Sequence, residues 1–232
     1  IGMLALMRFK QDLPALPPSK QHSSRKAEFL SGAKFVFRHP ILLPALSLDM
    51  VSVLFGGVTS LLPIYAAQIL MIGATGLGVL RAAPAAGAAI TAMWLTRFEI
   101  REKAGKYMLG VVAGFGICIL VFAVSQNFML SLIALLASGA FDCVSMVIRS
   151  SAIQLSSPDS MRGKIAAVNS IFVGSSNEIG EFESGVAAKI MGTVPSAIFG
   201  GVVCLLTVSI VAIVSPALRN MNLDELKKKT IV

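Results

Sequence analysis

Residues 194–218 read VPSAIFGGVVCLLTVSIVAIVSPAL, an apolar run without one charged side chain. An α-helix needs about 20 such residues to cross ~30 Å of hydrocarbon. The strands of a membrane β-barrel would instead be short segments in which apolar and polar residues alternate. The run therefore predicts a membrane-spanning helix.

Similar windows fill most of the remaining chain of 232 residues, of which 55% are hydrophobic and 14% charged. A soluble domain carries roughly 25% charged residues, so the composition argues against one. Open strands cannot cross lipid, because their edge N–H and C=O groups would lack partners. The sequence predicts an all-α integral membrane protein. Its six windows are 41–69, 76–96, 107–124, 128–148, 165–188 and 194–218.

The basic residues are distributed unevenly among the connecting segments. They lie before the first window, between the second and third, between the fourth and fifth, and after the last, whereas the loops 71–75, 125–127 and 192–193 have none. Lys and Arg favour the cytoplasmic side of a membrane. Both ends of the six-window block are therefore predicted to be cytoplasmic. This topology accounts for the net charge of +8, so no nucleic-acid partner is predicted.

The composition divides the chain into four parts. Residues 1–7 look like the tail of a truncated preceding membrane helix, and 8–38 form a Pro-containing basic linker. Residues 39–218 are predicted to be the six-helix bundle, and 219–232 a cytoplasmic tail. Apolar residues recur at helical spacing near the end of the linker. This end is either a short interfacial helix or an extension of the first span.

Signatures of enzymes, metal centres and cofactors are missing from the sequence. There is no H-E-x-x-H or G-x-S-x-G motif, and the three cysteines have no metal-ligand spacing. A repeated pore-lining motif, expected of a channel, is also missing. We therefore predict neither an enzyme nor a metal or cofactor site.

The residues 154–164, QLSSPDSMRGK, resemble the segment between the tenth and eleventh helices of efflux branches of the major facilitator superfamily, including enterobactin-exporter-like members. The loop 97–106 is similar to a degenerate form of that superfamily's basic, Gly-containing motif. The resemblance implies the C-terminal six-helix half of such a transporter in a bacterial cytoplasmic membrane, with a missing N-terminal half as partner. It also implies Asp159 and Arg162 as residues of a conformational cytoplasmic loop.

For function, the resemblance implies a secondary exporter that moves a small amphipathic molecule, such as a drug or siderophore, by alternating access. Protons are the expected driving ion. A lysophospholipid carrier from a neighbouring branch is the competing interpretation. The sequence does not choose between these substrates.

Charged residues inside the windows are the candidate site residues, since each costs roughly 2.5 to 3.5 kcal/mol at the bilayer centre. Glu178 and Glu181 lie one helical turn apart in the fifth window, beside Asn177 and Glu183. Two carboxylates so close in low dielectric resist simultaneous ionisation, so one of them can carry a proton. This window is predicted to line a cavity; helix packing is the alternative explanation for its polar residues.

The other charges have several possible roles. From its depth and the superfamily's architecture, Arg81 is expected to face Glu181 or Glu183, either in the cavity or as a structural ion pair. Asp142 is a candidate gate, helix-pairing residue or proton site. Asp49 is assigned to structure, and Arg149 is expected at a span end, where it can extend to the membrane surface. Both are also grouped with the loop residues Asp159 and Arg162 as candidates for a conformational role.

Overall fold

The computed structural model describes residues 25–98, 100, 102–158 and 161–226, and all regular elements within these ranges are helices. The predicted segment 1–7, the first part of the linker and the end of the tail lie outside the described residues. The elements are α1 (Arg25–Arg38), α2 (Leu42–Gly56), η2 (Val58–Leu61), α3 (Leu62–Ile64), η3 (Tyr65–Ile69), α4 (Gly73–Leu95), α5 (Ala104–Val124), α6 (Phe128–Ser156), α7 (Arg162–Met191), α8 (Thr193–Val214) and α9 (Pro216–Arg219).

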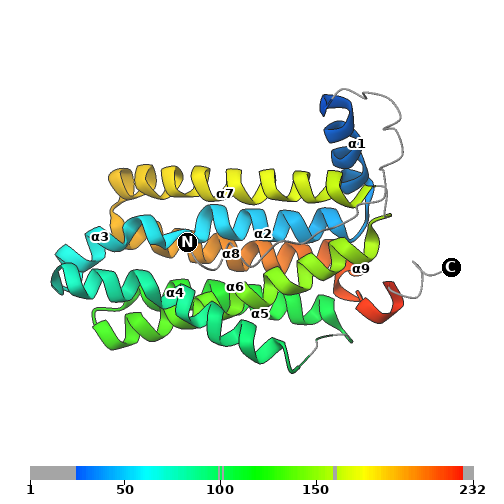
Figure 1. The fold of residues 1–232 in the computed structure, drawn as a ribbon. Coiled ribbons are helices and arrows are strands. Elements are labelled where there is room, and N and C mark those ends of the chain that lie inside the picture. Colours follow the sequence, from blue (N-terminus) through cyan, green and yellow to red (C-terminus); the bar gives the residue numbers. More distant parts are fainter. Residues whose placement is uncertain (1–24, 99, 101, 159–160, 227–232) are drawn as a thin grey trace, which may run out of the picture.

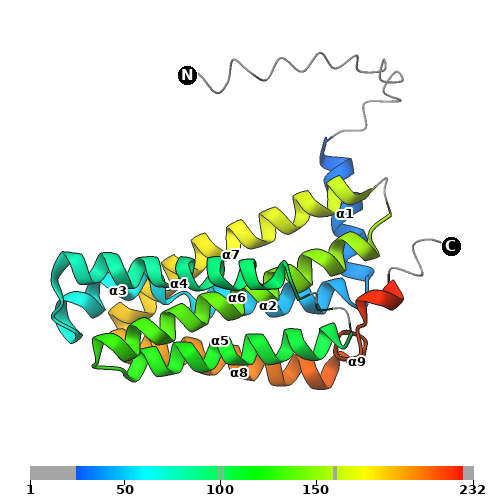
Figure 2. The same ribbon diagram turned by 60° about the horizontal axis from the view of Figure 1, so that its bottom comes forward.

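The long helices run side by side, and α1 crosses them at one end of the bundle (Figures 1 and 2). α4 lies along α6, α5 packs against both α6 and α8, and α2 packs against both α7 and α8. In this packing α2 and α6, which also contact each other, lie between α4 and α7.

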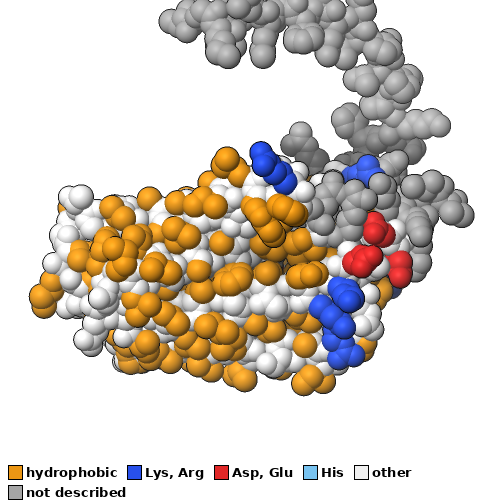
Figure 3. All heavy atoms as spheres, turned by 90° about the horizontal axis from the view of Figure 1, so that it is seen from below, with side chains coloured by type: hydrophobic (Ala, Val, Ile, Leu, Met, Phe, Trp, Pro, Cys, Tyr) orange, Lys and Arg blue, Asp and Glu red, His pale blue; other side chains and the backbone are white. Residues whose placement is uncertain are grey.

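Five helical segments among the described residues are long and apolar enough to cross a membrane. They are Leu42–Ile69, Gly73–Leu95, Ala104–Val124, Phe128–Ser156 and Thr193–Val214. α7 has 30 residues, or about 45 Å at ~1.5 Å per residue, but its polar and acidic side chains keep it out of this group. In Figure 3, hydrophobic side chains cover one face along the bundle and charged ones lie toward one end. The chain is a multi-pass membrane protein.

Glycines allow the helices to approach closely. A methyl group at Gly180 of α7 would lie 2.8 Å from the main-chain oxygen of Leu54 in α2. At Gly200 of α8 it would collide with the main-chain oxygen of Phe55. Small residues of this kind are common where membrane helices meet, because lipid supplies no hydrophobic force between helices.

The first span is not one continuous α-helix, although the window 41–69 is apolar throughout. α2 ends at Gly56, and Gly57 has φ −73° and ψ 64°, outside the helical region. A 3₁₀ turn, one α-turn beginning around Pro63 and a π-helical segment follow. Two consecutive glycines weaken the helix, and proline lacks the N–H that would bond back across the break. The part after the break is held by Tyr65, whose hydroxyl donates to the main-chain oxygen of Ala123 at 3.0 Å.

α1 is a separate helix rather than an extension of the first span. It packs against α7 and α2, with Val36 fully buried. The chain then turns at His39, whose Nδ1 accepts hydrogen bonds from the N–H groups of Ile41 and Leu42, both at 3.3 Å. This imidazole caps the start of α2.

The tail folds back onto the bundle after the last long helix. Leu218, Met221 and Leu223 are buried in the cluster that includes the start of α5. The N–H of Gly105 donates to the main-chain oxygen of Met221 at 3.2 Å. The first part of the predicted tail is therefore a packed element.

Candidate functional site

A cavity of about 170 Å³ opens where the first span breaks. α4 supplies Pro84, α6 supplies Ser138 and Asp142, and α7 supplies Asn177. The remaining lining residues are Val53, Gly56, Gly57, Val58, Thr59, Phe115, Ile119, Leu135 and Gly139. Two residues that the sequence singled out on different helices, Asp142 and Asn177, thus share one cavity wall.

The cavity wall is mainly apolar with a few polar groups. Asp142 is the one ionisable residue among those that line it. Gly56 and Gly57 have no side chains, so at the break the wall consists of main chain. Discontinuous helices of this kind form the central substrate and ion sites of several transporter folds, because their unwound main chain offers free polar groups.

A second, small cavity of about 10 Å³ lies beside the first and shares Val53, Phe115 and Asp142 with it. Asp49 and Ser145 are among its other lining residues. Asp142 thus lies between the main cavity and a more deeply buried charged group.

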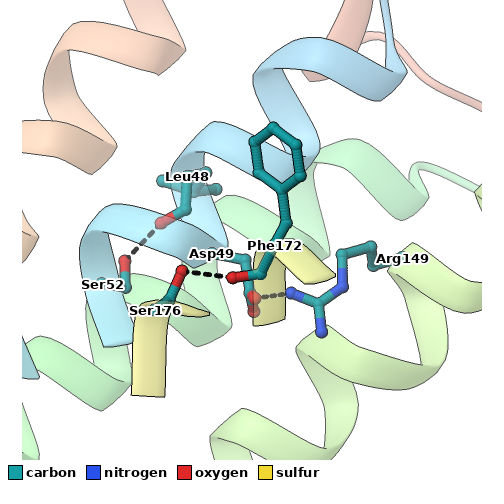
Figure 4. Close-up of polar contacts among 6 residues, drawn as sticks. All are labelled: Leu48, Asp49, Ser52, Arg149, Phe172 and Ser176. Carbon is teal, nitrogen blue, oxygen red and sulfur yellow. Dashed lines mark hydrogen bonds and ion pairs between the residues drawn. The ribbon is translucent and has the colours of Figure 1, made fainter. Parts of the chain in front are cut away.

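That buried group is an ion pair between Arg149 Nη1 of α6 and Asp49 Oδ2 of α2 (Figure 4). Each residue is only 5% exposed. The expectation that Arg149 extends to the membrane surface is wrong. The apolar window ends at residue 148, but α6 continues to Ser156, so Arg149 lies within the helix and meets Asp49.

Hydroxyl groups near the ion pair bond mostly within their own helices (Figure 4). Ser52 Oγ donates to the main-chain oxygen of Leu48 at 2.7 Å, and Ser176 Oγ donates to that of Phe172 at 2.6 Å. Cys204 Sγ of α8 lies 3.4 Å from Ser52 Oγ and donates to it. The contact between Cys204 and Ser52 is the one of these three that links two helices, α8 and α2.

The acids of α7 lie outside the cavity lining. Glu178 and Glu181 are exposed, and Glu183 is partly buried. Asn177 does line the cavity, and Glu181 lies one turn beyond it on the same face of α7, since residues four apart are neighbours on a helix.

The expected meeting of Arg81 with Glu181 or Glu183 does not occur. Arg81 is an exposed residue of α4, and among the described residues no ion pair is recorded for it. The reason is the way the helices pack: α4 lies on α6 and α7 lies on α2, so α2 and α6 separate Arg81 from the acids of α7. Equal depth along the membrane normal does not bring two side chains together.

The structure describes only one of the two residues predicted for a cytoplasmic loop. Asp159 lies outside the described residues, and Arg162 is the exposed first residue of α7. A larger cavity of about 440 Å³ opens at the same end of the bundle, lined by residues such as Phe98, Gln154 and Asp224. It contains none of the acids predicted inside the membrane, so the smaller cavity at the helix break is the better candidate site.

Sequence reasoning missed the break at Gly56–Gly57 and the lining residue Ser138. The dipeptide Gly56-Gly57 followed by Pro63 was a usable signal, because glycine and proline both disfavour a continuous helix. Ser138 gave no signal, since an isolated serine in an apolar window is most often a packing residue.

A family model described as transmembrane secretion effector matches residues 31–231. No curated protein and no solved structure matches the chain.

Proposed function

Because the chain belongs to the transmembrane secretion effector family, which is of the major facilitator type, we propose that it forms part of a secondary exporter of small amphipathic molecules. The mechanism is alternating access, in which a site near the membrane midplane is opened to one side and then the other. The observation that carries this proposal is the cavity at the break of the first span, with Asp142 and Asn177 on its wall.

The proposed driving ion is the proton. Glu178 and Glu181 are exposed on α7, and Glu181 follows the cavity residue Asn177 by one turn. A carboxyl group near the cavity mouth can bind a proton when the site faces one side and release it on the other. Asp142 is the third group able to do so.

The chain is proposed to work as one six-helix half, with α7 as the fifth of its six spans in chain order. Exposed carboxylates in the middle of α7 are costly against lipid, since a charge at the bilayer centre costs roughly 2.5 to 3.5 kcal/mol. A second six-helix half would cover this face and leave the acids around a water-filled path. The proposed site of action is a bacterial cytoplasmic membrane, with the C-terminus in the cytoplasm.

The test is uptake of a fluorescent amphipathic dye into inverted membrane vesicles that contain the full-length protein. A pH gradient with an acidic lumen drives the reaction. We expect wild-type protein to accumulate dye, and Glu178→Gln or Glu181→Gln to lose most of the gradient-driven part. Glu225→Gln is the matched control, because Glu225 is an exposed acid of the tail, outside the cavity.

Normal transport by both α7 variants would contradict the assignment of coupling to these acids. Wild-type vesicles that move no dye, but do move a lysophospholipid, would overturn the proposed substrate class.

A further inference from the structure

We infer that the cavity at the helix break binds the positively charged centre of a monovalent organic cation, with Asp142 as the counter-charge. This inference rests on the proposed export function and specifies its substrate class.

The charge balance of the cavity is the first argument. Asp142 is the one ionisable group among the lining residues, and no Lys or Arg side chain lines the cavity. Without a ligand, the ionised carboxylate has no counter-charge in that wall. A bound cation would supply it, whereas an anion would face a like charge.

The second argument concerns Arg149, the cation that could have neutralised Asp142. It lies two helical turns further along α6, and its guanidinium pairs with Asp49. Among the described residues, no ion pair is recorded for Asp142. Arg149 thus pairs with a carboxylate other than that of Asp142.

The third argument is the chemistry of the remaining polar groups. Ser138 Oγ donates its hydrogen to the main-chain oxygen of Leu135 at 2.7 Å, which leaves its lone pairs as acceptors. Asn177 contributes an amide oxygen, another acceptor. A protonated amine offers only donors, so these groups complement it.

The apolar part of the wall suits the rest of an amphipathic cation. Phe115, Ile119 and Leu135 line it. An aromatic face also attracts a cation directly, through the negative potential above its ring. The cavity of about 170 Å³ has room for a substituted ammonium group and a small apolar body.

The test is calorimetric binding of benzylammonium, a protonated primary amine, to the detergent-purified full-length protein. Phenylmethanesulfonate is the matched probe, since it has the same benzyl body with an anionic head. Asp142→Asn removes the charge at constant size, and we expect it to weaken cation binding at least about tenfold, the loss of one charge-assisted contact. Glu225→Gln is the matched control and should bind as wild type does.

A second variant keeps the test informative if Asp142→Asn is poorly folded. Thr59 is an exposed lining residue, so Thr59→Lys places a positive charge in the cavity and leaves Asp142 unchanged. We expect Thr59→Lys to abolish binding of benzylammonium.

Cation binding that is unchanged in both variants, or a wild-type preference for phenylmethanesulfonate, would overturn the inference. A failure of the proposed export function alone would give a different result. The cation would still bind in an Asp142-dependent manner, but wild-type vesicles would transport no dye.

Discussion

The Asp49–Arg149 pair joins α2 to α6 through two charges that the bundle shields almost fully from solvent. Removing two charges from water is costly, and mutual attraction returns part of that cost only while both partners are present. The pair is therefore sensitive to the loss of one member and tolerant of the loss of both.

We expect Asp49→Asn to lower the free energy of unfolding by about 3 to 5 kcal/mol, because it leaves the Arg149 charge buried without its partner. The double variant Asp49→Asn/Arg149→Gln should recover most of that loss. Thermal unfolding in detergent micelles measures both, with Glu225→Gln as control. A single variant as stable as wild type would contradict this account of the pair.

His39 makes the start of α2 sensitive to pH. Burial lowers the pKa of His39 below its ordinary 6.5. The folded state thus favours the neutral imidazole, whose Nδ1 accepts the two capping N–H groups. Below pH 6.5 the unfolded chain binds more protons, so this contribution is complete above pH 6.5 and is lost as the pH falls through the lowered pKa.

We expect wild-type protein to lose ~1 kcal/mol more stability than His39→Asn between pH 7.5 and pH 5, the usual contribution of a helix cap. Asparagine can cap a helix but does not titrate in this range. Unfolding in detergent at the two pH values measures the difference. Equal losses in the two proteins would show that the cap does not depend on the ionisation of His39.

At the scale of the elements, α7 contains glycines in two different environments. Gly180 faces the main chain of α2, whereas Gly185, one and a half turns further, has no atoms within 4 Å of the place a side chain would occupy. Substitution at Gly180 therefore reports on the close packing between α7 and α2, whereas substitution at Gly185 reports on the helix preference of the new residue alone.

We expect Gly180→Ala to destabilise the bundle by about 1 to 3 kcal/mol, because main-chain atoms cannot move aside as a flexible side chain can. Gly185→Ala should be neutral or slightly stabilising, since alanine favours a helix over glycine by roughly 0.5 to 1 kcal/mol. Thermal unfolding of the two variants side by side gives the comparison. Equal effects would mean that α7 and α2 do not pack as closely as described.

Helix positions were predictable where apolar composition marks them. The window 107–124 corresponds to α5 and 165–188 to the central part of α7. Composition does not reveal where a helix continues beyond the apolar run, so the extension of α6 to Ser156 was missed. It also does not reveal a break inside an apolar run, so the end of α2 at Gly56 was missed.

At the scale of the whole molecule, the sequence did not predict which helices lie next to each other in the plane of the membrane. The sequence gives depth in the membrane, and depth together with the superfamily's architecture suggested that Arg81 faces α7. Lateral neighbours depend on which helices pack against each other. α4 packs on α6 and α7 packs on α2, so α4 and α7 are separated. Asp142 and Asn177 were singled out for their polarity on two helices, and the packing of those helices places both on one cavity wall.

The predicted orientation is testable by labelling single cysteines with a membrane-impermeant maleimide. Thr75→Cys, near the start of α4, should react in intact cells, because the adjoining loop lacks Lys and Arg. Lys106→Cys, at the start of α5, should react only after the cells are permeabilised. Wild-type protein is the control, because Cys143 and Cys204 are buried and Cys118 is partly buried. The reverse labelling pattern would invert the topology.

Part of the cavity wall is main chain, because Gly56 and Gly57 form it without side chains. Mutations that replace side chains elsewhere leave those peptide groups in place. Over evolutionary time, selectivity would therefore diversify through exchanges at positions such as Thr59, Ser138 and Asn177. The glycine pair would be retained, so the same main-chain peptide groups would contact each different substrate.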